Sequence, residues 1–325
     1  MGKIFTSLGL MSGTSMDGVD ASTIISDGDK GTITSLKNQY FEYDKHLYQK
    51  LTNLRDKITY SKDLKNYVNE LNLIEKEITL FHAKVVNEIT QSLPKHEIDI
   101  VGFHGQTIFH NADEKLSVQL GDAKLLSQQI KKKVVYNFRQ NDLKNSGQGA
   151  PLTPIFHQNL VRNINLNWWP VTILNIGGIS NATSVSKLYP LDLTDDKDYK
   201  LFAQDIGPGN CLIDEWIRRN SKYRFDKDGL IARSGNVNTL IFNQAVENFL
   251  NLESSKNESL DIKNFDISFV RGLTLEDGAA TLTHFTAKLI EEGLTNFMIK
   301  NYTPRIDILS ESTCLVCGGA VSYTH

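Results

Sequence analysis

The 325-residue sequence contains little cysteine, and its three residues, Cys211, Cys314 and Cys317, are too few for a disulfide framework. So few cysteines are typical of a reducing compartment. No apolar run reaches the ~18 residues that a membrane-spanning helix requires. The N-terminus also lacks the charged, apolar and small-residue order of a signal peptide. We therefore expect a cytoplasmic protein with no membrane partner.

The sequence also lacks a strong excess of charge of either sign. It has 35 Lys and Arg against 38 Asp and Glu, a formal net charge of −3. This balance excludes a general electrostatic attraction to nucleic acid or to membrane surfaces. Hydrophobic residues make up 40% of the chain, and its length allows two domains of ordinary size.

Cys314 and Cys317 form a C-x-x-C pair without a second pair of ligands. A structural zinc site needs four ligands, and the sequence has no further C-x-x-C or H-x₃-H pair. We expect this segment to be a buried strand that ends in a glycine turn. In such a strand, free cysteines behave as small hydrophobic residues rather than as a metal or redox site.

Several common catalytic motifs are missing. The sequence contains no G-x-x-x-x-G-K-[ST] phosphate loop and no G-x-G-x-x-G that opens a helix. It also has no G-x-S-x-G of serine hydrolases and no protein-kinase catalytic-loop or D-F-G signature. These absences exclude the most familiar nucleotide-binding and hydrolase classes.

The most informative motif is a glycine-bracketed turn at residues 13–18, between strand-like segments at 4–11 and 19–25. Tight hairpins of this kind expose backbone N–H groups that can bind an anion. Thr14 and Ser15 add hydroxyl donors, and Asp17 can hold a hydrated Mg²⁺. An ordinary β-turn uses the same residue types, so the motif alone leaves both interpretations open.

The rest of the first half predicts helices and short strands. Helical spacing runs over 62–93 and ends at Pro94. A strand at 98–103 is expected to present His104, Gln106 and Thr107 at its carboxyl end. Further expected elements are strands at 117–120 and 134–138, a helix at 123–130, a loop at 139–150 and a short helix with Pro151 in or near its first turn. The apolar face expected for the long helix comprises Leu64, Val68, Leu71, Leu73, Ile74, Ile78, Phe81, Val85, Val86 and Ile89.

The second half repeats this order. A strand at 171–176, a tight turn at 177–181 and a return strand at 182–185 precede a long helix at 274–299. A strand at 315–317 then enters Gly318 and Gly319. We therefore predict an α/β fold of two similar domains, 1–170 and 171–325, with a cleft between them. The polar stretch 252–264 is expected to be a surface insertion.

Nine collinear blocks make nearly the whole chain resemble the anhydro-N-acetylmuramic acid kinase family of the actin/hexokinase/Hsp70-like superfamily. The blocks are GLMSGTSMDGVDA (9–21), GFHGQTIFH (102–110), VQLGD (118–122), FRQNDLKNSGQGAPLTPIFHQ (138–158), LNIGGISN (174–181), DIGPGNCLIDEW (205–216), FDKDG (225–229), DGAATLTHFTAKLI (277–290) and CLVCGGA (314–320). The resemblance implies a two-domain actin-like ATPase architecture. It also implies ATP-dependent conversion of 1,6-anhydro-N-acetylmuramate and water to N-acetylmuramate 6-phosphate, in the recycling of peptidoglycan.

The resemblance also implies roles for individual residues. Asp205 falls on the family's general base; the alternative is an Asx-turn or a helix cap. His104, Gln106, Thr107 and Arg139 would bind the sugar; the alternative for His104 is a structural histidine bonded to backbone. Asp17 would be nearest the Mg²⁺, and the protein would form a homodimer. The residues expected to bind ATP are Gly13, Thr14, Ser15, Met16, Asp17, Gly18, Val19, Asp20, Gly177, Gly178, Asn181, Gly318 and Gly319.

Two departures from the family pattern stand out. Asn137 occupies a position at which the family usually has Asp. The sequence ends shortly after Gly318-Gly319, where the family continues, so we expect a C-terminally truncated member. Two alternatives to activity on 1,6-anhydro-N-acetylmuramate therefore stay open. The protein is a non-catalytic family member, or it is a kinase of another anhydro-sugar.

Overall fold

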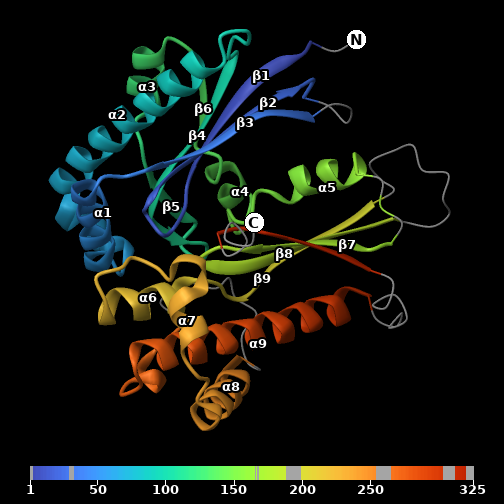
Figure 1. Ribbon diagram of the computed structural model, residues 1–325. Coiled ribbons are helices and arrows are strands. Elements are labelled where there is room, and N and C mark those ends of the chain that lie inside the picture. Colours follow the sequence, from blue (N-terminus) through green and yellow to red (C-terminus); the bar gives the residue numbers. More distant parts are fainter. Residues whose placement is uncertain are drawn as a thin grey trace. The chain divides into compact units, whose positions relative to one another are not determined.

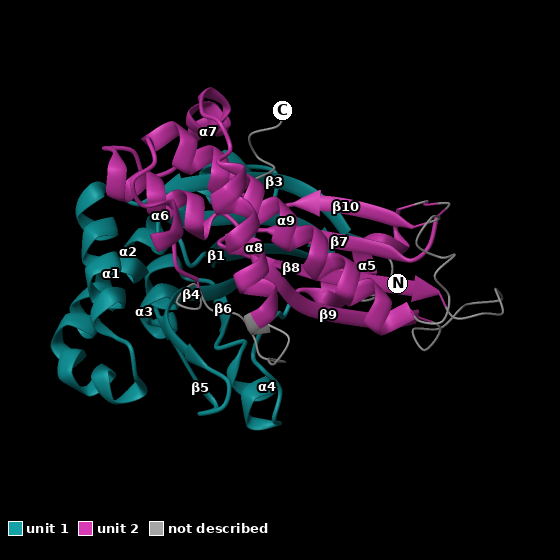
Figure 2. Ribbon diagram, turned by 90° about the horizontal axis from the view of Figure 1, so that it is seen from below, with its two compact units in different colours: residues 1–152 teal, residues 153–325 magenta. Residues whose placement is uncertain are grey.

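A computed structural model of the chain describes residues 3–28, 33–164, 166, 168–187, 199–253, 265–302 and 312–319 (Figure 1). By its internal contacts the chain divides into two compact units, Met1–Leu152 and Thr153–His325 (Figure 2). This division assigns residues 153–170 to the second unit. The domain boundary at 170/171 and the cleft expected between the domains stay predictions. The expected surface insertion at 252–264 lies almost wholly outside the described residues.

Unit 1 is a mixed sheet covered by helices. Its elements are β1 (Phe5–Ser12), β2 (Gly18–Ser26), β3 (Ile33–Glu42), α1 (Lys45–Lys57), the 3-10 helix η1 (Ser61–Tyr67), α2 (Val68–Ser92), β4 (Ile100–Asn111), β5 (Leu116–Leu120), α3 (Ala123–Ile130), β6 (Lys133–Tyr136) and α4 (Gln140–Lys144). The strand order is β3-β2-β1-β4-β5, and β6 pairs with β4. β1 runs antiparallel to β2 and parallel to β4.

Unit 2 is built on the same strand order. Its elements are α5 (Pro154–Arg162), β7 (Val171–Ile176), β8 (Ile179–Lys187), β9 (Tyr199–Pro208), α6 (Cys211–Asn220), the 3-10 helix η3 (Lys227–Gly229), α7 (Leu230–Ser234), α8 (Thr239–Glu253), the 3-10 helix η5 (Ser268–Val270), α9 (Leu275–Tyr302) and β10 (Thr313–Cys317). The described sheet has the order β10-β7-β8-β9. β7 pairs antiparallel with β8 and parallel with β10.

The two units share one topology. In each, a strand pairs with the next one as an antiparallel hairpin, a third strand continues the sheet, and a long helix precedes a strand parallel to the first. β1, β2, β3 and β4 thus correspond to β7, β8, β9 and β10. The order and direction of the strands therefore confirm the predicted α/β class and the predicted internal repeat.

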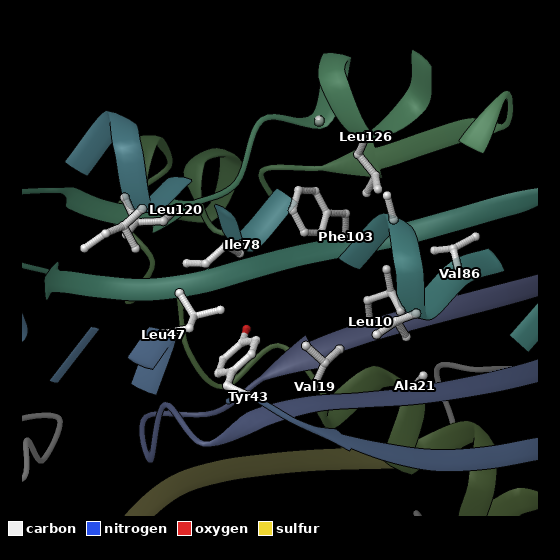
Figure 3. Packing of buried hydrophobic residues seen from close by; sticks show 14 of the residues in the cluster. Leu10, Val19, Ala21, Tyr43, Leu47, Ile78, Val86, Phe103, Leu120 and Leu126 are labelled. Carbon is white, nitrogen blue, oxygen red and sulfur yellow. The ribbon is translucent and has the colours of Figure 1, made fainter. Parts of the chain in front are cut away.

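The main core of unit 1 lies between its sheet and its helices. Side chains of α1, α2 and α3 pack on β1, β2, β4 and β5, and Figure 3 shows Tyr43, Val19, Leu47 and Phe103 within this core. Leu51, Leu54 and Ile78 are also fully buried here. At about 1.5–3 kcal/mol for each large apolar side chain buried, this cluster stabilises the sheet against the helices.

In unit 2, helices lie on both faces of the sheet. Leu174, Ala182 and Ile206 pack with Phe297 and Met298 of α9. On the opposite face, a second cluster packs strand residues against Val161 of α5; it comprises Val161, Val171, Ile173 and Val185. We call these surfaces the α9 face and the α5 face of the unit 2 sheet.

Local signals explain where several helices begin. The Asp44 carboxylate accepts from the backbone N–H groups of His46 and Leu47, 2.8 and 2.9 Å away, at the start of α1. Asp122 caps α3 in the same way. Pro154, rather than Pro151, occupies the first turn of α5, so the expected position of Pro151 was wrong.

Several other expectations were wrong in detail. His104, Gln106 and Thr107 lie within β4 rather than beyond its end, because Gly105 adopts φ +73° and the strand continues to Asn111. Residues 140–144 of the expected loop form α4. On the long helix, Val68 and Leu73 are exposed rather than part of the apolar face.

The second half contains two further corrections. Asn181 lies in β8 and is not part of a turn. Cys314 and Cys317 are exposed, because β10 is the end strand of the described sheet and its side chains are covered only in part. The expectation of a buried strand was therefore wrong. None of the described helices combines the length and apolar character needed to cross a membrane.

A pair of Leu→Ala substitutions tests the core of unit 1. Leu54 is 0% exposed, whereas Leu73 is 67% exposed. Leu54→Ala is expected to lower the free energy of unfolding by about 2–5 kcal/mol because it leaves a cavity. The matched control Leu73→Ala should change it by less than about 0.5 kcal/mol. Urea unfolding followed by circular dichroism measures both, and equal losses would contradict this packing.

Candidate functional site

The first glycine turn, residues 13–18, joins β1 to β2. The backbone N–H of Met16 donates to the carbonyl oxygen of Gly13 at 3.2 Å, and Met16 adopts φ +58°. A Cβ on Gly18 would clash with the carbonyl oxygen of Phe41, so this position requires glycine. Thr14 and Ser15 are exposed at the tip of the turn. The turn therefore has a defined backbone and presents its hydroxyl groups to solvent.

Carboxylates gather beside this turn. The Ser15 hydroxyl donates to Asp17 at 2.6 Å. Partial desolvation, followed by the charge of Asp17, raises the pKa of Asp20, although Asp20 as a whole is exposed. Burial and then the charge of Asp17 also raise the pKa of Tyr40. Asp17 and Asp20 are thus close enough for their charges to interact.

Gln106 supports the turn from the neighbouring strand. It is fully buried, and its side-chain amide donates to the carbonyl oxygen of Gly13 at 2.8 Å. Ser12, the last residue of β1, is its ladder partner. The structure therefore brings Gln106 to the predicted phosphate turn, whereas the sequence predicted it on the sugar side.

His104 and Arg139 form a partly buried pair. His104 Nδ1 lies 2.7 Å from the carbonyl oxygen of Gly105, which can only accept, so Nδ1 carries the proton. Nε2 then accepts from Arg139 Nε and Nη2, at 3.2 and 3.0 Å. Arg139 Nη1 donates to Gly149 O at 2.9 Å. His104 is thus both bonded to backbone and in contact with a candidate ligand-binding residue.

The charges of this pair differ. Burial, followed by the charge of Arg139, lowers the pKa of His104 to about 4, so the imidazole is neutral near pH 7. Burial lowers the pKa of Arg139, but a guanidinium stays protonated. Among the described residues, no ion pair includes Arg139. Arg139 can therefore supply an uncompensated positive charge to an anion.

The Thr107 side chain contacts the neighbouring strand β5. Its hydroxyl accepts from Gln119 of β5 at 3.3 Å, and this bond ties β4 to β5. The structure links His104 to Arg139 and Gln106 to the first glycine turn, and the Gln106 side chain also donates to the carbonyl oxygen of Thr107 at 3.4 Å. Asn137 is exposed with φ +62°, a conformation that Asn tolerates better than most residues.

In unit 2, glycines meet where two parallel strands end. β7 ends at Ile176 before Gly177 and Gly178, and β10 ends at Cys317 before Gly318 and Gly319. Gly318 adopts φ +106°, and a Cβ there would lie 2.5 Å from the carbonyl oxygen of Ile176. Ligands of open α/β sheets bind beyond such carboxyl ends.

The start of α6 joins the same cluster. The N–H groups of Gly209 and Asn210 donate to the carbonyl oxygens of Gly178 and Gly177, at 2.9 and 2.7 Å. A Cβ on Gly209 would clash with the Gly177 carbonyl oxygen. The second glycine turn, residues 177–178, is therefore held against the first turn of α6.

Asp205 lies beside this cluster in a polar row across the sheet. The register pairs Cys317 with Asn175, Asn175 with Asn181, and Asn181 with Asp205. Alternate residues of a strand share a face, so Asn181 shares the α5 face with Thr183, which contacts His157 of α5 at 2.9 Å. Asp205 is half-buried within β9. It is therefore not a cap of α6, whose N-cap is Asn210.

Sequence reasoning missed Asn175 and Asn210. Asn175 lies in the matching block LNIGGISN, two residues before Gly177, and Asn210 lies in DIGPGNCLIDEW. Both blocks were recognised, but the position of Asn175 became clear only with the strand register, and that of Asn210 with the start of α6. The signal for Asn175 was its place before a glycine pair at the end of a predicted strand.

The titration of His104 gives a test of its pairing with Arg139. The folded-state pKa of about 4 lies below the ordinary 6.5, so the unfolded chain binds more protons between these values. The free energy of unfolding should therefore decrease as the pH falls from 6.5 to 4, and His104→Asn should reduce this slope. His82 contributes in the same direction and leaves a residual slope. An NMR titration that places the pKa of His104 near 6.5 would contradict this account.

The chain is similar to known anhydro-N-acetylmuramic acid kinases over nearly its whole length. The family model described as "Anhydro-N-acetylmuramic acid kinase" matches residues 5–324. The anhydro-N-acetylmuramic acid kinase of Pelagibacter ubique is 50% identical over 319 residues, covering 98% of this chain and 80% of that protein. That of Agrobacterium fabrum is 35% identical, with the same coverage.

Solved structures are much more distant. A ROK family glucokinase from Streptomyces griseus is similar at 11% identity and a TM-score of 0.37, covering 99% of this chain and 85% of that one. A TM-score this low does not identify a shared fold. The family match extends to residue 324, and the matched segment covers 80% of the length of each of these two kinases. The chain belongs to the anhydro-N-acetylmuramic acid kinase family.

Proposed function

We propose that this protein converts 1,6-anhydro-N-acetylmuramate, ATP and water to N-acetylmuramate 6-phosphate and ADP. The observation that carries the proposal is the family match over residues 5–324, together with the placement of Asp205 in a polar row beside the glycine cluster. The substrate is a small amino sugar. The cytoplasm as the site of action and a homodimeric state are proposed from the family resemblance alone.

We assign ATP to the two glycine turns. In unit 1, residues 13–20 supply backbone N–H groups, the hydroxyls of Thr14 and Ser15, and two carboxylates. In unit 2, Gly177, Gly178, Asn181, Gly318 and Gly319 belong to or adjoin the glycine cluster. Phosphoryl transfer depends chiefly on positioning and charge neutralisation, and backbone donors in fixed turns suit this task.

The donor set beside the first glycine turn fits Mg²⁺. This ion is commonly held by one or two carboxylates, several waters and the substrate phosphates. Asp17 would hold it with Asp20 nearby, and the raised pKa of Asp20 supports their proximity. When bound, Mg²⁺ would neutralise negative charge on the β- and γ-phosphates.

Asp205 is assigned as the general base. Its carboxylate accepts a proton from a water as the water oxygen bonds to the anomeric carbon. The bond from that carbon to O6 breaks, and O6 bonds to the γ-phosphorus as ADP leaves. A single carboxylate is enough, because phosphorus captures the leaving oxygen, whereas glycosidases ordinarily need a second carboxyl group as acid.

The sugar is assigned to His104, Thr107 and Arg139. Arg139 is a planar donor of fixed charge, suited to the lactyl carboxylate. The neutral His104 accepts two of its N–H groups and fixes its orientation. Gln106 contacts Gly13, so its role is to support the phosphate turn.

Asp205→Asn tests the catalytic assignment. Loss of a general base is expected to reduce kcat by about 10²–10⁴-fold. The assay detects ADP by a coupled reaction and the sugar 6-phosphate by mass spectrometry. Asp228→Asn makes the same change at an exposed residue whose αL backbone Asn tolerates, and it should leave kcat unchanged. A folded Asp205→Asn variant with normal turnover would contradict the assignment.

Asp17→Asn tests the metal assignment. Removing one carboxylate should raise the Mg²⁺ concentration required for half-maximal activity by about tenfold, which corresponds to about 1.4 kcal/mol. Asp113→Asn, an exposed change elsewhere in unit 1, is the control. An unchanged Mg²⁺ requirement in Asp17→Asn would remove Asp17 from the site.

A further inference from the structure

A buried chain of hydrogen bonds lies directly behind the first glycine turn. Ser12 Oγ is 3.0 Å from the Tyr43 hydroxyl and 3.3 Å from His82 Nε2. His82 Nδ1 lies 2.8 Å from the carbonyl oxygen of Ile78. Ser12, Tyr43 and His82 are each at most 1% exposed. None of the three can reach a ligand in solvent, so any effect on the reaction passes through the turn.

The donor and acceptor of every hydrogen bond in this series follow from its last acceptor, the carbonyl oxygen of Ile78. The Ile78 carbonyl oxygen only accepts, so Nδ1 of His82 carries its proton and Nε2 is an acceptor. Ser12 therefore donates to Nε2, and Tyr43 donates to Ser12. Burial lowers the pKa of His82 to about 4, which is consistent with this neutral tautomer. Each member has a partner, so removing one leaves a buried polar group unsatisfied.

Tyr43 connects both ends of the turn. Its hydroxyl bonds to Ser12, which immediately precedes the turn, and its backbone N–H donates to the carbonyl oxygen of Asp17 at 2.8 Å. Figure 3 shows its ring within the hydrophobic core, beside Val19 and Leu47. Gln106 independently holds Gly13. Residues 12, 13 and 17 are thus attached to three other segments of unit 1.

We propose that Tyr43, Ser12 and His82 are positioning residues that fix the first glycine turn for the ATP phosphates. This inference rests on the proposed role of the turn in binding ATP. His82 lies on α2, 65 positions away from Asp17 in the chain and outside the recognised blocks. Misplacement of phosphate donors is costly in phosphoryl transfer, where positioning dominates catalysis.

The kinetic test compares four variants of the full-length protein. His82→Met and Tyr43→Phe each remove one side chain from the hydrogen-bond chain, and His82→Gln retains an acceptor that can face Ser12. Thr79→Val is the matched control, because Thr79 is also buried on α2 but bonds to the Asp122 N–H instead. We expect kcat/KM for MgATP to fall about tenfold in His82→Met and Tyr43→Phe. The KM for the sugar should be unchanged, His82→Gln should recover much of the loss, and Thr79→Val should retain normal kcat/KM.

Amide hydrogen exchange tests the same inference without activity. The Met16 and Tyr43 amides are bonded to carbonyl oxygens of the turn, and their exchange should accelerate in His82→Met but not in Thr79→Val. Unchanged exchange in a folded His82→Met protein, or equal acceleration in Thr79→Val, would overturn the positioning role.

The two proposals fail in distinguishable ways. A wild-type protein without ATP-dependent turnover contradicts the proposed function, while the exchange measurement still decides the positioning role. An active wild type with unchanged kcat/KM for MgATP in both His82→Met and Tyr43→Phe contradicts the positioning role alone.

Discussion

The pairing of two parallel strands in each sheet is the constraint on which the glycine turn of each unit depends. In unit 1 it places Ser12, at the end of β1, opposite Gln106 of β4. In unit 2 it places Asn175, near the end of β7, opposite Cys317 of β10. Each pairing sets a glycine turn against a polar side chain of the neighbouring strand. A one-residue slip in either register would move these side chains to the opposite face.

The two glycine turns are held by different interactions. The first has side-chain support from buried polar groups of Tyr43, α2 and β4, with the carboxylates on its exposed side. The second is held by backbone bonds from Gly209 and Asn210 and by close approaches that only glycine permits. The repeated topology thus provides one framework, and the two copies have acquired different chemistry at corresponding strand ends.

Local patterns predicted several elements of the fold, but not β3, β9 or α8. Alternation and glycine placement identified the two hairpins, and helical spacing identified α2 and α9. The polar run after Phe103 was misjudged, because Gly105 in the left-handed region lets the strand continue where a turn was expected. The exposure of Cys314 depends on the position of β10 at the end of the described sheet, and no local pattern encodes that position.

The candidate site was predictable only where a motif carried it. Asp205, the two glycine turns and Arg139 were named from the recognised blocks. The contact of Gln106 with Gly13, the tautomer of His104 and the chain from Tyr43 to His82 depend on long-range pairing. His82 and Tyr43 have no signature in the sequence. The local pattern does not show whether a buried position holds a hydrogen-bonded polar side chain or only an apolar contact.

Isotope tracing tests the central claim, that water attacks the anomeric carbon while O6 accepts the phosphoryl group. The enzyme is incubated with the anhydro-sugar and MgATP in ¹⁸O-labelled water, and the product is analysed by mass spectrometry before its anomeric oxygen exchanges with solvent. The account predicts one ¹⁸O atom on the anomeric carbon of the product and none in its phosphoryl group. Label in the phosphate, or release of labelled inorganic phosphate without sugar phosphorylation, would contradict it.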